Sequence, residues 1–403
     1  MSSCGSYSYS YSYRGPCAPS PHASAQCQQA YQSFDCHEQS LHCSYTQTHH
    51  DCHPQPPTVS VLTLANDLAA SMGAGVQGDV GCDTDPTAAQ LAVLQALAAG
   101  ATTDTSTAID GDNQTVALAG GDGDVISIDS GDSNTFVVGN GAGDSLNIDS
   151  GDANTLFAGN GDGDFLNLGT GDNNVLWAGD GDGDMLNVGT GNNNDLHAGN
   201  GDTDFVMVGT GDDNCVTVGD GTGSIAYVSS GNSNELSVGN GSGDFVVVDS
   251  GDNNMMTAGN GATDVLSVGT GDHNTLAAGT GDGDSLSVDT GSYNFLHAGN
   301  GVGDVAHIGD GDYNALILGN GNNDQVVVEQ GSHNVLAQGD GNNDILQLGD
   351  GGLTSGTTMG QTGGGDDNIL LQGNGTNDFI FLGGANFDSV TGGHLGTTVN
   401  AGN

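Results

Sequence analysis

Hydrophobic residues recur with a ten-residue period along the central part of this chain. Between residues 111 and 350, the sixth and eighth positions of each ten-residue unit are nearly always aliphatic, as at Leu166 and Leu168. This alternation is typical of a short strand that buries one face. Every tenth residue from Gly111 to Gly341 is glycine, and segments rich in Gly, Asp and Asn separate the strands. The sequence therefore predicts short strands, each followed by a six-residue turn.

The full repeat is twenty residues long, because the fourth position alternates between Asp and Asn. An Asp half, such as residues 161–170, is followed by an Asn half, such as residues 171–180, with Gln114 and Ser224 as exceptions. Glycine is too frequent for helices and does not occupy every third position, as it does in collagen. We therefore predict an all-β fold, a parallel β-roll or β-solenoid of 20-residue coils with two short strands per coil, and twelve coils in residues 111–350.

The turn that precedes the inward residue Leu146 resembles a known calcium-binding repeat. Its sequence, Gly139-Asn140-Gly141-Ala142-Gly143-Asp144, is similar to the Gly-Gly-x-Gly-x-Asp-x-U-x repeat of RTX (haemolysin-type) β-rolls. The resemblance covers residues 111–384, although here the period is ten residues and alternate turns end in Asn. It implies calcium ions held between coils, secretion without a cleaved N-terminal signal, and folding once calcium is met outside the cell.

The charge of the chain independently favours a bound cation. The sequence has 50 acidic residues and one basic residue, Arg14, which gives a formal net charge of −49. Stacked turns would place the aspartates of successive Asp halves about 4.8 Å apart, so they must raise one another's pKa or bind a counter-ion. Carboxylate and turn carbonyl oxygens favour calcium over zinc or copper. The predicted calcium ligands are Asp124, Asp144, Asp164, Asp184, Asp204, Asp244, Asp264, Asp284, Asp304, Asp324, Asp344 and Asp378.

The Asn halves contain a second acidic column, which gives a further set of candidate calcium ligands. These are Asp132, Asp152, Asp172, Asp212, Asp252 and Asp272. Asn174 and its equivalents would either form a hydrogen-bonded amide ladder or offer carbonyl oxygens to an ion. In the simplest alternative, Asp and Asn serve only as turn formers.

The N-terminal residues differ in composition from the repeats. Residues 1–57 are rich in Ser, Tyr, Gln, Pro, Cys and His, which predicts a disordered tail. Its cysteines and histidines could hold zinc or copper, or the thiols could be oxidised or cross-linked between chains. The candidate ligands of this soft-metal site are Cys36, His37, His42, Cys43, His49, His50, Cys52 and His53.

Residues 58–110 are expected to form a small helical cap on the first coil. After a short apolar stretch at 59–70, residues 87–99 read as a helix with Asp85 as N-cap and Gly100 at its end. Such a cap would cover the open edge of the solenoid, and binding a partner is the alternative. Beyond the twelve coils we expect a Gly/Thr-rich insertion at 351–364, a further coil at 365–384, and a tail at 385–403 that is either a cap or an uncleaved export signal.

Two features inside the repeat depart from a plain core and a polar surface. Gln338 occupies an inward position, and the sequence offers no reason for it. Outward positions in six consecutive Asp halves are apolar, which indicates an interaction surface for self-association, with β-propensity alone as the alternative. This apolar stripe consists of Phe165, Met185, Phe205, Ile225, Phe245 and Val265.

These observations favour an extracellular or cell-surface structural protein over an enzyme. The negative charge argues against nucleic acid as a partner, and no run is apolar enough for membrane insertion. No Sec signal peptide is expected, so type I-like secretion would fit the RTX resemblance. We predict a calcium-binding structural, surface-layer or adhesive protein that folds on calcium, self-associates, and contacts a cell-surface or extracellular-matrix partner. The alternatives are an ice-binding solenoid that uses Thr170, Thr190 and Thr210, and a metal-sequestering protein that acts through its tail.

Overall fold

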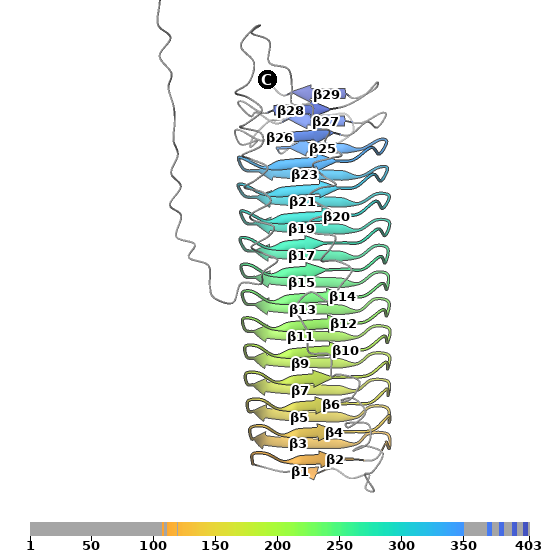
Figure 1. Cartoon of the computed structure of the whole chain (residues 1–403), viewed down its shortest axis with the longest axis vertical. Coiled ribbons are helices and arrows are strands. Elements are labelled where there is room, and N and C mark those ends of the chain that lie inside the picture. Colours follow the sequence, from red (N-terminus) through yellow and green to blue (C-terminus); the bar gives the residue numbers. More distant parts are fainter. Residues whose placement is uncertain are drawn as a thin grey trace, which may run out of the picture. The chain divides into compact units, whose positions relative to one another are not determined.

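The chain forms two parallel β-sheets that stack coil upon coil in a computed structural model (Figure 1). The structure describes residues 107–108, 111–118, 120–349, 369–372, 379–382, 389–392 and 398–401. All 29 strands of these ranges belong to the two sheets, and no helix able to cross a membrane is found within them. The predicted all-β parallel solenoid with a 20-residue repeat is confirmed.

The odd-numbered strands form one sheet and the even-numbered strands form the other. Sheet A contains β1 (Thr107–Ala108), β3 (Val125–Ser130), β5 (Ser145–Ser150), β7 (Phe165–Thr170), β9 (Met185–Thr190), β11 (Phe205–Thr210), β13 (Ile225–Ser230), β15 (Phe245–Ser250), β17 (Val265–Thr270), β19 (Ser285–Thr290), β21 (Val305–Asp310), β23 (Gln325–Gln330), β25 (Ile345–Leu348), β27 (Phe379–Leu382) and β29 (Thr398–Ala401). Sheet B contains β2 (Thr115–Ala117), β4 (Thr135–Val137), β6 (Thr155–Phe157), β8 (Val175–Trp177), β10 (Asp195–Ala198), β12 (Cys215–Val218), β14 (Glu235–Val238), β16 (Met255–Thr257), β18 (Thr275–Ala277), β20 (Phe295–Ala298), β22 (Ala315–Leu318), β24 (Val335–Gln338), β26 (Ile369–Gln372) and β28 (Ser389–Gly392).

The core lies between the two sheets and is built from the predicted inward positions. Leu166 pairs with Leu186 in register, twenty residues later, and both side chains are fully buried. Identical positions therefore stack as columns along the solenoid, which buries a continuous apolar core. Gln338 is also fully buried, as predicted, and the register places it between Leu318 and Gln372.

The turns differ from the expected six residues: between β3 and β25 they have four residues after sheet A, and six or seven after sheet B. Strand β7 continues to the tenth position of its Asp half, so only four residues, 171–174, precede β8. Seven residues, 178–184, separate β8 from β9. The longer strand forms because Thr170 pairs in register with Thr190, which extends the ladder beyond the inward residues.

The two ends of the solenoid differ from the predicted boundaries. Strand β1 lies within the segment assigned to the cap, and it pairs with β3. Strands β26 and β27 form the further coil predicted at 365–384. Strands β28 and β29 then continue both sheets through the segment predicted to be a cap or export signal. The tail at 1–57, the predicted helix and the insertion at 351–364 lie outside the described residues.

Two positions in each Asp turn favour glycine, for different reasons. A Cβ built on Gly181 would lie 1.7 Å from the carbonyl oxygen of Gly161, one coil earlier. The third position has a positive φ in both kinds of turn, 75° at Gly183 in an Asp turn and 60° at Asn173 in an Asn turn, which Gly and Asn tolerate at low cost. The first glycine thus permits close stacking, and the second permits the chain reversal.

Replacing Gly181 with alanine is expected to lower the free energy of unfolding by about 1–3 kcal/mol, because the added methyl must displace backbone atoms. Gly183→Ala is the matched control in the same turn. Its Cβ would meet only Thr203 Oγ1, at 4.0 Å, so the cost is backbone strain of about 1 kcal/mol. Urea unfolding midpoints would distinguish them, and equal midpoints would contradict the close-approach interpretation.

Candidate cation site

The fourth residue of each Asp half points into the solenoid and forms a buried column. Asp144, Asp184 and Asp204 have no exposed surface, and Asp164 is 1% exposed. We call this set the inner aspartate column; within the described residues it consists of Asp124, Asp144, Asp164, Asp184, Asp204, Asp244, Asp264, Asp284, Asp304, Asp324 and Asp344, with Ser224 in the one remaining coil. The predicted stacking of these aspartates is confirmed.

One carboxylate oxygen of each aspartate is held by the backbone of the preceding coil. The N–H of Asp164 donates to Asp184 Oδ1 at 2.8 Å, and the equivalent bonds along the column measure 2.8–3.1 Å. At the exception, the N–H of Asp204 donates to Ser224 Oγ at 3.2 Å. The column is thus a ladder that links side chain to backbone from coil to coil.

The second carboxylate oxygen, Oδ2, is buried and has no hydrogen-bond partner. This holds for Asp144, Asp164, Asp184, Asp204, Asp244, Asp264, Asp284, Asp304 and Asp324. A buried acceptor that has lost water without gaining a donor costs about 1–3 kcal/mol, and more when it is charged. The column therefore needs a proton or a cation at Oδ2.

The asparagine column on the other side of the solenoid gives both polar side-chain atoms a partner in most coils, and Asn134 Nδ2 and Asn154 Nδ2 are the buried exceptions. The N–H of Asn174 donates to Asn194 Oδ1 at 2.9 Å, which repeats the aspartate ladder. In addition, Asn194 Nδ2 donates to the carbonyl oxygen of Gly171 at 3.0 Å, and six further coils repeat this bond at 3.0–3.1 Å. The predicted amide ladder is confirmed, and its oxygens are already engaged.

The aspartate Oδ2 occupies the place that Nδ2 takes in the asparagine column. A Cβ built on Gly311 would lie 1.7 Å from Gly291 O and 2.8 Å from Asn314 Nδ2. A Cβ on Gly321 would lie 1.6 Å from Gly301 O and 2.5 Å from Asp324 Oδ2. Where asparagine donates to a glycine carbonyl, aspartate therefore presents a second acceptor to it.

The electrostatics of the column follow from this arrangement. Burial raises the pKa of the carboxyls, neighbouring carboxylates raise it further, and the backbone hydrogen bonds lower it in part. The pKa rises to about 7 at Asp164, Asp184, Asp204 and Asp284, and to about 6 at Asp144, Asp264 and Asp324. The pKa of Asp244 and that of Asp304 are raised for the same first reason, burial.

The donor set of the inner column fits calcium in ligand type. Unpartnered carboxylate oxygens face glycine carbonyl oxygens, and calcium prefers such hard oxygen ligands. Within the described ranges, no three His, Cys, Asp or Glu side chains converge in a way that could hold a metal. An ion here would therefore depend on backbone carbonyls as well as on carboxylates.

The second predicted column lies on the surface of the Asn turns. Its carboxylates also hold the backbone, as when the N–H of Asp172 donates to Asp152 Oδ1 at 2.9 Å. Its six members, Asp132, Asp152, Asp172, Asp212, Asp252 and Asp272, are exposed or half-buried. The asparagines beside this column contribute no buried oxygen that lacks a hydrogen-bond partner among the described residues, unlike the aspartates of the inner column. The inner column is therefore the better candidate for binding a cation.

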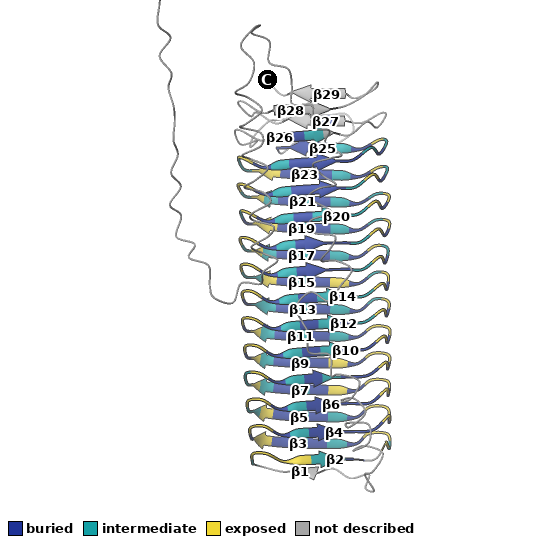
Figure 2. Ribbon diagram, viewed as in Figure 1, coloured by how far each residue is buried: buried dark blue, intermediate teal, exposed yellow. Residues whose placement is uncertain are grey.

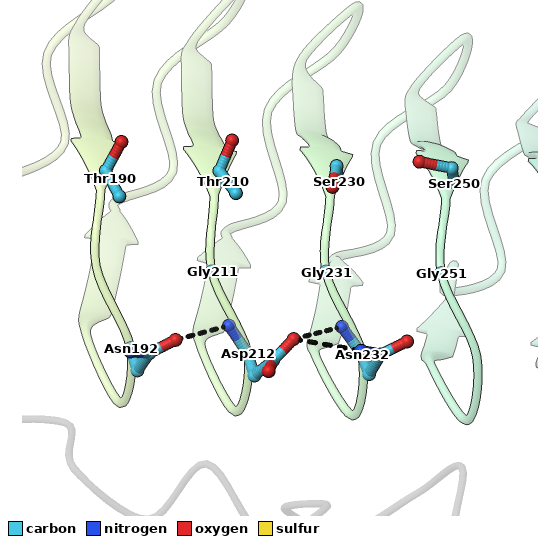
Figure 3. A pocket seen from close by; sticks show the side chains of 10 residues that line it. All are labelled: Thr190, Asn192, Thr210, Gly211, Asp212, Ser230, Gly231, Asn232, Ser250 and Gly251. Carbon is cyan, nitrogen blue, oxygen red and sulfur yellow. Dashed lines mark hydrogen bonds between the residues drawn. The ribbon is translucent and has the colours of Figure 1, made fainter.

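A polar groove of about 340 Å³ runs beside this second column (Figure 3). In it, the N–H of Asp212 donates to Asn192 Oδ1 at 2.8 Å, and the N–H of Asn232 donates to Asp212 Oδ1 at 2.7 Å. Hydroxyl side chains form its other side, namely Thr190, Thr210, Ser230 and Ser250. The groove is thus lined by hydroxyl and turn oxygens that repeat once per coil.

The remaining predicted sites fall into two groups. The apolar stripe is contiguous in sheet A, and Phe165, Met185 and Phe245 are 36%, 42% and 43% exposed. Asp378 and the soft-metal residues of the tail lie outside the described residues. The glycine carbonyls opposite each Oδ2 were not singled out from the sequence, because only the stacked register brings them to the carboxylates.

Comparison with known proteins identifies neither a family nor a function for this chain. The sequence matches no known family and no curated protein, and the fold matches no solved structure. The resemblance to RTX repeats therefore depends on the turn sequence alone, and the parallel solenoid is compatible with it.

The raised pKa values predict that the metal-free protein is stabilised by acid. The folded-state pKa lies above the unfolded value of 3.8, so the stabilising contribution is present in acid and is lost as pH rises through about 6 to 7. The melting temperature in chelator should fall between about pH 5 and pH 8. Asp164→Asn should flatten this slope more than Asp162→Asn, which changes an exposed turn residue. A slope that is flat in the wild type would contradict the prediction.

Exchanging the two columns at single positions should have opposite effects. Asp324→Asn gives the side chain an N–H for the Gly301 carbonyl, so we expect a stabilisation of about 1–3 kcal/mol in chelator at about pH 6, where the metal-free rod is still folded. Asn194→Asp removes the bond to Gly171 and should destabilise by about the same amount. Thermal melts would measure both changes, and changes of the same sign would contradict the equivalence of the two columns.

Proposed function

We propose that this chain is a calcium-stabilised structural rod that acts outside the cell as a surface-layer or adhesive component. The observation that carries the proposal is the buried row of partnerless Oδ2 atoms that face glycine carbonyls. Such a column opposes folding at neutral pH unless its charge is neutralised. The chain has a single basic residue, Arg14, so it cannot neutralise the column with its own cations.

The residues that would hold calcium are the inner aspartates and the carbonyls opposite them. Asp324 Oδ2 and the carbonyl oxygen of Gly301 are one such pair, and Asp304 Oδ2 and the carbonyl oxygen of Gly281 are another. When bound, calcium supplies the positive charge that these oxygens lack. Each aspartate keeps its Oδ1 on the backbone of the preceding coil, so closing a site also fixes the register between two coils. Ion binding and coil stacking would thereby be one event.

An extracellular location follows from the ion that the column requires. Extracellular calcium-binding modules work with dissociation constants of about 10⁻⁴–10⁻³ M, which suits sites that contain few carboxylates. Calcium-dependent folding would then keep the chain unfolded before export, as the RTX resemblance implies. A regular stack of coils offers rigidity and long faces, which favours a structural role over a catalytic one.

Self-association through the apolar stripe would extend the rod into an assembly. The stripe runs across five ladder spacings, about 24 Å, and Phe205, Ile225 and Val265 join the three exposed residues in register. Its members carry no charge, in a chain of net charge −49. A second copy of the same face would bury these apolar side chains.

Ice binding is the second candidate function, and the surface rank of hydroxyl groups favours it. Ser or Thr occupies the tenth position of nine consecutive Asp halves, and adjacent members pair in register, as Thr190 does with Thr210. This row of Ser and Thr side chains lies along one edge of the groove in Figure 3. It therefore presents a narrow row of hydroxyl groups to ice and not a broad flat surface. Thermal hysteresis that is lost in Thr190→Val would support ice binding, and its absence in the wild type would exclude it.

Calcium titration into chelator-treated protein is expected to restore strand signal in circular dichroism at neutral pH. Magnesium should restore much less, because it retains its waters and demands a small octahedral site. Asparagine in place of Asp164, Asp184 and Asp204 together should reduce the calcium requirement, whereas the same change at Asp152, Asp172 and Asp212 of the second column is the matched control. A wild-type rod that is fully folded in chelator would contradict the proposal.

Disrupting the apolar stripe is expected to reduce association without unfolding the rod. A triple change of Phe165, Met185 and Phe245 to serine removes its most exposed side chains. Sedimentation velocity in calcium should then show a smaller species than the wild type, with unchanged circular dichroism. Serine at Asn167 and Asn187, on the same face, is the control. Equal sedimentation of all three proteins would contradict association through the stripe.

A further inference from the structure

Four aromatic rings stack on one another along the turns that follow sheet A. They occupy the third position of four consecutive Asn turns, with neighbouring ring centroids 4.5–5.0 Å apart and ring planes within 14° of parallel. The eight preceding coils have Asn, Ser, Ala or Asp at this position. The rings are therefore a feature of four coils and not of the repeat. We call this set the aromatic ladder; it consists of His273, Tyr293, Tyr313 and His333.

The aromatic ladder is exposed at a backbone position that disfavours large side chains. All four residues have a φ of 59–62°, in the left-handed region that bulky residues rarely adopt. Tyr293 and Tyr313 are 44% and 47% exposed, and exposed residues gather in the turns at the edges of the sheets (Figure 2). Stacking between the rings offsets the strain, but it leaves their edges at the surface. Strained residues of this kind cluster at functional sites, which singles out this edge of the solenoid.

The order of the four residues is symmetric along the solenoid. His-Tyr-Tyr-His reads the same in both directions. A two-fold axis perpendicular to the solenoid axis, between Tyr293 and Tyr313, would place each tyrosine opposite the other tyrosine of a second copy. The same axis would place His273 opposite His333. A two-fold contact uses the same patch on both copies, and this patch matches itself when reversed.

Charge decides whether two copies can approach each other at this edge. The chain has a net charge of −49 and a single basic residue, so a contact between copies must keep carboxylates apart. At the second position of these turns, the two-fold axis would place each aspartate opposite a serine, whose hydroxyl can donate to it. Rods that ran in the same direction at equal height would instead bring like residues together. This column consists of Asp272, Ser292, Asp312 and Ser332.

Two further columns, at the ends of the sheet A strands, follow the same rule. Reversal places Asp310 opposite Thr290, and it places Asp289 and Glu329 opposite glycines. None of the five carboxylates in the three columns would therefore face another carboxylate of its own column. The tenth position carries Thr270, Thr290, Asp310 and Gln330, and the ninth carries Gly269, Asp289, Gly309 and Glu329.

We propose that the aromatic ladder and its flanking columns form a two-fold contact between antiparallel copies of this chain. The contact depends neither on bound calcium nor on the apolar stripe, which lies on the outer face of sheet A. It spans four coils, about 19 Å, so a single contact is small and weak. Combined with the proposed contact through the stripe, it would link rods on two sides into an extended layer instead of a closed dimer.

The test permutes one column without changing the net charge. Ser292→Asp with Asp312→Ser keeps every aspartate opposite a serine, whereas Asp272→Ser with Ser292→Asp places two aspartates opposite each other. Both residue types accept the backbone N–H of the next coil. Asp272 Oδ1 accepts from Ser292 at 2.7 Å, and Ser292 Oγ accepts from Asp312 at 3.1 Å. Both permuted variants should therefore fold like the parent, which is the full chain with serine at Phe165, Met185 and Phe245 to remove the stripe.

Sedimentation equilibrium over a range of protein concentrations measures the association. The buffer holds the lowest calcium concentration at which circular dichroism shows the rod folded, so that few ions can bridge exposed carboxylates. We expect the first variant to associate like the parent. The second should need a concentration about tenfold higher, because two like-charge pairs form at once. Asparagine at both Tyr293 and Tyr313, which the left-handed turn accepts, should abolish association.

Three outcomes would overturn the proposal. Equal association of the two permuted variants would mean that the copies do not meet in the antiparallel order. Unchanged association after both tyrosines are replaced would mean that the contact lies elsewhere. A parent that stays monomeric at every concentration reached would mean that the aromatic ladder does not join copies of this chain.

Discussion

The parallel register of the coils is the constraint on which the rest of this structure depends. Each residue lies directly beside its equivalent twenty residues earlier, as Leu166 lies beside Leu186. A residue type that recurs at one position of the repeat therefore forms a column of like side chains along the solenoid. An inward leucine becomes a continuous core, but an inward aspartate becomes a column of buried carboxylates whose charges add. Because the register keeps these carboxylates next to one another, their negative charges must be neutralised along the whole column.

The two polar columns differ in one side-chain atom, which is an amide nitrogen in asparagine and a carboxylate oxygen in aspartate, and this difference makes the stability of one side depend on solution conditions. Asparagine and aspartate have nearly the same shape, and both use Oδ1 to hold the preceding coil. The amide Nδ2 of Asn194 completes a bond to a glycine carbonyl, whereas the matching oxygen of Asp184 has no partner. From Asn174 onward, the hydrogen bonds of the asparagine side are thus completed by the chain itself, whereas the aspartate side depends on a proton or a cation from solution.

Periodicity alone predicted most of the fold and the existence of the candidate site. The spacing of Leu166 and Leu168 gave the inward positions, and the repeat of Asp164 and Asp184 gave the column. Other features could not be predicted, because they arise only between coils. Pairing at Thr170 lengthens the sheet A strands, and the glycine carbonyls meet Oδ2 only in the stacked register.

Carbon-13 NMR of protein labelled at the aspartate carboxyl groups tests the central claim most directly, because it reports the ionisation of each side chain. In chelator, the account predicts a set of carboxyl resonances that stay protonated in the folded rod up to about pH 6 to 7 and ionise as the rod loses its fold. These resonances should shift on addition of calcium, whereas those of the exposed turn aspartates should change little. A folded, metal-free rod whose aspartates all titrate near about pH 4 would contradict the account, because the buried column would then tolerate its charge without a proton or a cation.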